Sequence, residues 1–121
     1  MKLEREMMRG AGPTAVMHLL NSGEMYGYEI VERLAKQSNG IFQMGQSTLY
    51  PMLYNLEAKG LVASTNKVGP NGRERRYYRL TSAGKKRLDK DRKQWAALVQ
   101  GMSALGMTRD AVPGLAMSES F

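Results

Sequence analysis

The amino-acid sequence predicts a mainly helical α+β fold with three short helices, a small β-hairpin and one long C-terminal helix. Apolar residues repeat at helical spacing up to about residue 60, and between Leu61 and Leu80 the period changes to the alternation of strands. Helical spacing returns after Thr81 and continues to Leu105. With 121 residues, the chain is long enough for one modest domain and too short for two separate cores.

The first two helices are predicted from their start and stop signals. Residues 3–9 are expected to form a short leading turn that ends at residues 10–12, Gly-Ala-Gly. Pro13 then suits the first turn of a new helix, because its missing N–H would be unpaired there anyway. Residues 26–28, Tyr-Gly-Tyr, open a second helix, and residues 38–40, Ser-Asn-Gly, stop it.

The third helix has the clearest pattern. Its apolar residues follow the i, i+3, i+4, i+7 rule and are Leu49, Met52, Leu53 and Leu56. Ser47 or Thr48 is expected to cap its start, and a cap at Thr48 places Pro51 in the first turn, where proline costs little. The opposite face carries groups that the core does not need, namely Ser47, Thr48, Pro51, Tyr54 and Asn55, with Tyr50 at its edge.

The hairpin is predicted from two alternating runs around a turn. Residues 61–65 and 75–80 are expected strands, and residues 69–72, Gly-Pro-Asn-Gly, form the turn between them. On the second strand Tyr78 and Leu80 share one face, while the other face carries Arg75, Tyr77 and Arg79. Three helices followed by a hairpin with a basic top and tip is the element order of a winged helix-turn-helix, which we assign to residues 1–80.

The charge distribution indicates a polyanionic partner. The formal net charge is +7, and residues 61–121 hold twelve of the eighteen Lys and Arg side chains but only five of the eleven Asp and Glu. Such an asymmetry is typical of proteins that bind nucleic acid, and the alternative is a solvated surface kept soluble by its lysines. In a winged helix the third helix offers its polar N-terminal face to the major groove, and hairpin arginines neutralise phosphates. The predicted DNA-binding residues are Gln46, Ser47, Thr48, Tyr50, Tyr54, Arg73, Arg75 and Arg76.

The last predicted helix covers residues 81–105 and is capped by Thr81-Ser82. Its apolar positions form a heptad-like seam of Leu88, Trp95, Val99, Met102 and Leu105. Residues 106–121 lack periodicity and are expected to be a flexible tail.

Four segments, taken in order, resemble the PadR family of bacterial transcriptional regulators. They are Tyr26-Gly27-Tyr28-Glu29-Ile30, Ser47-Thr48-Leu49-Tyr50-Pro51-Met52-Leu53, Leu56-Glu57-Ala58-Lys59-Gly60-Leu61-Val62 and Arg76-Tyr77-Tyr78-Arg79-Leu80-Thr81-Ser82-Ala83-Gly84. The resemblance extends from about Glu6 to about Leu105. It implies a homodimeric repressor that is joined through its N-terminal segment and long last helix, binds a roughly palindromic operator and releases it when a small molecule binds.

A ligand site is also suggested by the resemblance. Trp95 is similar in position to a tryptophan that stacks on flat aromatic ligands in the short, multidrug-responsive members of the family. Met7 and Met8 are candidates for the same cavity, because methionine adapts to varied shapes. The alternatives are a dimer-interface role for Trp95 and ordinary core packing for the two methionines.

Other classes of function have little support in the sequence. No catalytic triad order, P-loop or zinc spacing is present, so we predict no enzyme, no cofactor and no metal site. The lone His18 is expected to be half-buried. No apolar run suggests a signal peptide or a membrane span, and the absence of cysteine fits a cytoplasmic protein. Two alternatives stay open: a winged-helix protein-interaction module, and a DNA-binding regulator without a ligand.

Overall fold

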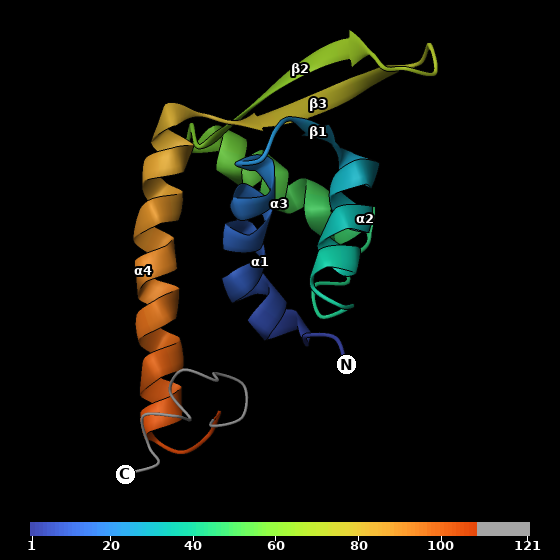
Figure 1. Ribbon diagram of the computed structural model, residues 1–121. Coiled ribbons are helices and arrows are strands. Elements are labelled where there is room, and N and C mark those ends of the chain that lie inside the picture. The colour runs from blue at the N-terminus through green and yellow to red at the C-terminus, as the bar shows by residue number, and fades with distance from the viewer. Residues whose placement is uncertain (109–121) are drawn as a thin grey trace. The chain divides into compact units, whose positions relative to one another are not determined.

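The computed structural model confirms the mainly helical class and the winged helix-turn-helix order (Figure 1). It describes residues 1–108. Their elements are α1 (Arg5–Leu20), β1 (Met25–Tyr26), α2 (Gly27–Gln37), α3 (Gln46–Ala58), β2 (Val62–Val68), β3 (Glu74–Leu80) and α4 (Ser82–Ala104). The chain forms two compact units, Met1–Leu88 and Asp89–Phe121, with the boundary inside α4.

The predicted break at residues 10–12 is wrong, because α1 runs through it without interruption and Pro13 lies inside the helix. The glycine serves close packing instead. A Cβ on Gly12 would lie 2.7 Å from Cε of Met52, so the end of the Met52 side chain packs directly on this glycine and would have to move to admit a larger residue. Proline removes one helical hydrogen bond, and the burial of this stretch against α3 outweighs that loss.

The core of the first unit joins all three short helices to the sheet. Val16, Ile30 and Leu49 are fully buried, one from each of α1, α2 and α3. Leu53 and Leu56 continue the inward face of α3, as predicted from their spacing. Leu88, in the early turns of α4, also belongs to this core.

The sheet has three strands, not the two that the sequence predicted. The short strand β1 pairs with β3, which gives the antiparallel order β1-β3-β2 with Tyr26 opposite Tyr77. Tyr77 is therefore only 9% exposed although it lies on the outer face with Arg75 and Arg79. The rings of Tyr26 and Tyr77 meet edge to face, with centroids 5.6 Å apart. A two-residue strand carries too little alternation to be recognised in sequence.

Helix α3 begins two or three residues earlier than expected. Its N-cap is Gly45, which makes no side-chain hydrogen bond, so the predicted cap at Ser47 or Thr48 is wrong. The N–H groups of Thr48 and Leu49 donate to the Gly45 carbonyl at 3.1 and 3.0 Å. Pro51 consequently lies in the second turn, where the Ser47 carbonyl loses its helical donor.

The predicted cap of α4 is confirmed at Thr81. Its hydroxyl oxygen accepts a hydrogen bond from the Gly84 N–H at 3.0 Å and donates one to the Gly60 carbonyl at 2.7 Å. These bonds join the end of the hairpin to the start of α4. The helix ends at Ala104, close to the predicted 105, and the expected tail lies outside the described residues from 109 onward.

Candidate nucleic-acid interface

The N-terminal turn of α3 is open to solvent. Gln46, Ser47 and Thr48 are all exposed, and the first turn contains no acidic residue. Because Gly45 supplies no side-chain cap, the N–H groups of Gln46 and Ser47 remain available to an external acceptor. This end of the helix can therefore accept a phosphate or approach base edges closely.

The two tyrosines of α3 differ in their surroundings. Tyr54 is 73% exposed, whereas Tyr50 is 42% exposed and folds back toward the start of α2. A Cβ on Gly27 would lie 2.4 Å from the Tyr50 hydroxyl, so the phenol rests directly on this glycine. The Tyr54 side chain can thus reach a partner. Tyr50 is held at the edge of the exposed face of α3, which we call the recognition face.

Cations on the outer face of the hairpin are held by aromatic rings. The guanidinium of Arg75 lies 4.2 Å from the centroid of Tyr26, and the ammonium of Lys67 lies 4.6 Å from that of Tyr77. Lys67 also pairs with Glu24 in the loop before β1. These contacts fix the hairpin to β1 and give both cations a defined position.

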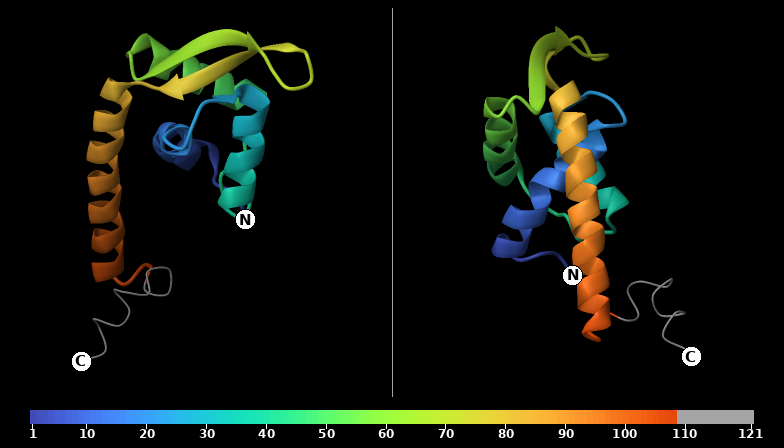
Figure 2. Two further views of the ribbon diagram at one scale, coloured as in Figure 1. Left: turned by 45° about the horizontal axis from the view of Figure 1, so that its top comes forward. Right: turned by 90° about the vertical axis from the view of Figure 1, so that its left-hand side faces the viewer.

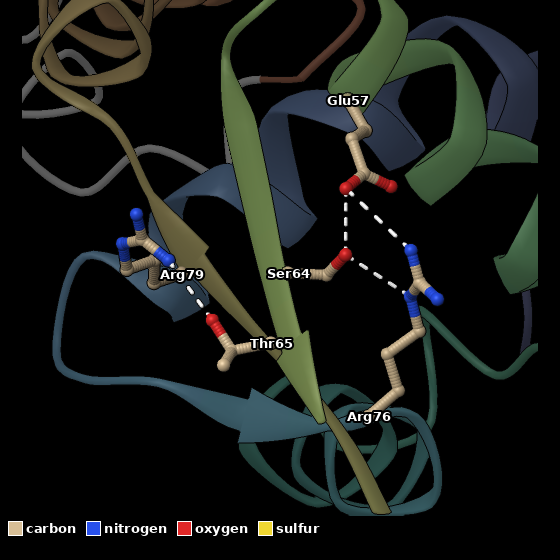
Figure 3. A network of polar contacts seen from close by, with 5 residues as sticks. All are labelled: Glu57, Ser64, Thr65, Arg76 and Arg79. Carbon is tan, nitrogen blue, oxygen red and sulfur yellow. Dashed lines mark hydrogen bonds and ion pairs between the residues drawn. The ribbon is translucent and has the colours of Figure 1, made fainter. Parts of the chain in front are cut away.

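Arg76 points to the opposite face of the sheet, toward α3. Its Nε donates to the Ser64 hydroxyl at 3.0 Å, and that hydroxyl donates to Oε2 of Glu57 at 2.6 Å. Nη2 of Arg76 also lies 3.8 Å from the same carboxylate oxygen. Figure 3 shows this triangle beside the sheet, with Arg79 bonded to Thr65 on the other face. The triangle ties the hairpin to the end of α3.

One titratable group lies inside this junction. Burial raises the pKa of the Tyr78 phenol above its ordinary value, and the nearby Arg76 guanidinium partly opposes that rise. The neutral phenol is therefore the form that the folded hairpin holds.

Arg73 lies at the tip of the hairpin and is exposed. The turn is closed by the Gly69 N–H, which donates to the Arg73 carbonyl at 2.8 Å, and by Gly72, whose φ of 81° requires glycine. Within residues 1–108, no ion pair engages the Arg73 side chain. Of the three predicted hairpin arginines, Arg73 is thus the one that needs no rearrangement to meet a phosphate.

A groove that sequence reasoning missed borders α3 on the side away from the hairpin. It has a volume of about 620 Å³ and lies between the N-terminal segment, the loop before α3 and α3 itself. Its polar lining residues are Lys2, Arg5, Arg9, Gln43, Thr48 and Asn55. We call it the N-terminal groove. The signal available in the sequence was the i, i+4 spacing of Arg5 and Arg9.

The three residues suggested for a ligand site have different environments. Met8 is buried in the core and lines the N-terminal groove, whereas Met7 is 58% exposed. Trp95 is half-buried on the part of α4 that belongs to the second unit. His18 is exposed, so the expectation that it is half-buried is wrong.

The sequence matches the family model described as the transcriptional regulator PadR-like family over residues 16–90. The chain belongs to this family. It is also 36% identical to transcriptional regulator Rv3488 of Mycobacterium tuberculosis over 74% of this chain and 79% of that protein.

Solved structures agree with this assignment. A PadR family transcriptional regulator from Eggerthella lenta is 36% identical and superposes with a TM-score of 0.71, covering 85% of this chain and 88% of that one. Bacillus subtilis PadR in complex with operator DNA is 26% identical with a TM-score of 0.60, over 66% of this chain and 45% of that chain. Among the described residues of this PadR-like protein, no helix is long and apolar enough to span a membrane.

Proposed function

We propose that this protein is a dimeric transcriptional repressor that binds operator DNA through the N-terminal face of α3 and the β2–β3 hairpin. The observation that carries the proposal is the uncapped, exposed start of α3 beside a hairpin rich in Lys and Arg. Gln46, Ser47 and Thr48 are the candidate base readers, and Arg73 and Arg75 the candidate phosphate contacts. The solved complex of Bacillus subtilis PadR with operator DNA supports the same partner for this chain.

The hairpin arginines divide between two roles in this proposal. Arg73 and Arg75 contact the backbone, since one is at the tip and the other is on the outer face. Arg76 contributes charge from a fixed position, because Glu57 and Ser64 hold it. Tyr54 reaches DNA more readily than Tyr50, which rests on Gly27.

A second copy of the chain is the proposed partner of α4. Leu98, Val99 and Leu105 are 44%, 37% and 79% exposed, which is unusual for an apolar helix seam in a protein that stays monomeric. A dimer brings two recognition helices to successive major grooves, about one helical turn apart. Repression is the proposed sign of regulation, since a relative from Bacillus subtilis is named a negative transcriptional regulator.

The proposed effector is a small planar aromatic molecule that stacks on Trp95, with Met7 and Met8 as further candidate contacts. Titration of the protein with a panel of planar aromatics, followed by Trp95 fluorescence, tests this part alone. Quenching that coincides with release of DNA supports a sensor. A flat response leaves a DNA-binding regulator without a ligand.

Selection of bound duplexes from a random pool tests the main proposal. We expect a two-fold symmetric site with half-sites about ten base pairs apart. Thr48→Ala and Gln46→Ala should each change the selected sequence, whereas Arg73→Ala should weaken all sequences alike and lower the salt slope by about 0.9 per protomer. Absence of binding to any duplex at low salt would instead favour a protein-interaction module.

A further inference from the structure

We propose that the N-terminal groove holds the DNA backbone, so that phosphates are contacted on both sides of α3. This inference rests on the proposed operator binding and adds a surface to it. In the right-hand view of Figure 2, α3 lies between the hairpin and the N-terminal turns of α1. The groove shares Thr48 with the recognition face, so a duplex docked on α3 lies at its mouth.

The charge of the groove selects an anion. Lys2, Arg5 and Arg9 line it, and none of its lining residues is acidic. Glu4 and Glu6 belong to the same segment but lie outside the lining. Helical spacing explains this separation, because Arg5 and Arg9 share one face of α1 and Glu6 does not. The segment is nearly neutral as a sequence and positive on the side that faces α3.

The cations of the groove are available to a partner. Within residues 1–108, no ion pair or side-chain hydrogen bond engages Lys2, Arg5 or Arg9. The segment that carries them is nevertheless anchored. The Leu3 N–H donates to the Ile41 carbonyl at 3.1 Å, and Leu3 packs against the core. Free cations on a fixed backbone are suited to phosphate contact.

The lining of the groove combines apolar and polar groups. Its floor is apolar, with Met8, Met44 and Met52, and its rim carries the polar groups of Thr48 and Asn55. The cations at one wall and the Asn55 amide at the other can contact a phosphate and its sugar together, while Thr48 lies between the groove and the bases. A sugar-phosphate strand therefore finds charge, hydrogen bonds and apolar surface in one place.

The test compares Arg5→Gln/Arg9→Gln with Arg33→Gln/Lys36→Gln in the full chain. Both double variants remove two exposed cations, but the second pair lies on α2, away from the groove. We expect the groove variant to raise the Kd for a selected duplex roughly ten-fold at low salt and to reduce the salt slope by about 1.8 per protomer. Phosphate ethylation interference should lose signals on the side of the half-site away from the hairpin.

The possible outcomes separate the two proposals. If the wild-type protein binds no duplex, the proposed function fails. If it binds and the groove variant behaves like the α2 variant, the groove inference is overturned while the function stands. If light scattering shows that the groove variant loses affinity only because it dissociates, the groove belongs to a contact between two copies and the inference is also overturned.

Discussion

The two sides of α3 carry positive charge in different ways. On the hairpin side, four of the five described cations are held by neighbours, and Arg73 at the tip is the exception. Lys67 is held by Glu24 and Tyr77, Arg75 by Tyr26, Arg76 by Glu57 and Ser64, and Arg79 by Thr65. In the N-terminal groove, Lys2, Arg5 and Arg9 have no such neighbours among residues 1–108. One side is preorganised and the other is adaptable.

This difference predicts different consequences on binding. A cation that is already held loses less side-chain entropy when it meets a phosphate, but it acts only if its support keeps the right geometry. A free cation loses more side-chain entropy when it binds, but it can follow small changes in the position of the phosphate. Substitution of the residues that hold the hairpin cations should therefore change the affinity for DNA. Substitution of residues near the groove cations should change it less.

The largest expected effect comes from Gly84→Ala, at the base of the hairpin. A Cβ on Gly84 would lie 2.1 Å from the Leu61 carbonyl oxygen and 2.6 Å from Cδ1 of Leu80. Because one of these atoms is backbone, the junction between hairpin and α4 must shift. We expect a loss of about 3 kcal/mol in the free energy of unfolding, measured by urea denaturation, and a Tm lower by roughly 10 °C.

Gly10→Ala is the matched change on the other side. Gly10 lies in the interior of α1, and no atom lies within 4 Å of its Cβ position. Alanine should therefore stabilise the protein by about 0.5–1 kcal/mol through helix propensity. Equal destabilisation by both substitutions would contradict the distinction between a tightly packed hairpin junction and a tolerant α1 segment.

Glu57→Gln should have the next largest effect and tests whether the support of Arg76 matters. Removal of a carboxylate from a DNA-binding surface normally strengthens binding, since it reduces repulsion. Here it also weakens the hold of Glu57 on Ser64 and Arg76. If geometry dominates, the Kd for operator DNA should rise about two- to five-fold, as expected for a partly exposed ionic network.

Glu29→Gln is the control for Glu57→Gln. Glu29 also pairs with an arginine, Arg33, at 3.2 Å, but on α2. Electrostatics alone predicts slightly tighter binding for both variants in anisotropy titrations. Tighter binding by the Glu57 variant would show that Arg76 contacts DNA more strongly when Glu57 does not hold it. The claim that the held geometry of the hairpin arginines favours DNA binding would then be wrong.

Residue spacing predicted most of the fold but not the contacts between elements. The inward face of α3, the hairpin and the cap at Thr81 follow from local patterns. The continuity of α1 did not follow, because Gly12 and its neighbours are buried against residues distant in sequence, such as Met52, which packs on Gly12. A glycine in a helical pattern is therefore only a weak stop signal when the rest of the segment can be buried by tertiary packing.

The candidate site was predicted in the same partial way. Alternation placed Arg75 and Arg76 on opposite faces, but it could not show that Glu57 holds one and Tyr26 the other. The N-terminal groove was missed for a related reason. Glu4 and Glu6 nearly neutralise the charge of this segment in the sequence, and only the structure shows that the face with Arg5 and Arg9 borders α3.

The smallest expected effect is a pH dependence of stability that comes from Tyr78 in the hairpin. Burial raises the pKa of Tyr78 in the folded state, so the folded protein holds this proton more tightly than the unfolded chain does. Its contribution to stability is fully present below the unfolded value of about 10 and is lost as the pH rises through the folded pKa. Stability should therefore fall above about pH 10.

Tyr78→Phe should remove this part of the alkaline loss, whereas Tyr54→Phe, which alters a ring that is 73% exposed, serves as the control. The measurement is the Tm of each protein as a function of pH. Since Tyr78 packs beside Arg76, its ionisation should loosen the hairpin before it affects the N-terminal groove. Hydrogen exchange that rises first in β2 and β3 would support this order, and exchange that rises first in α1 would reverse it.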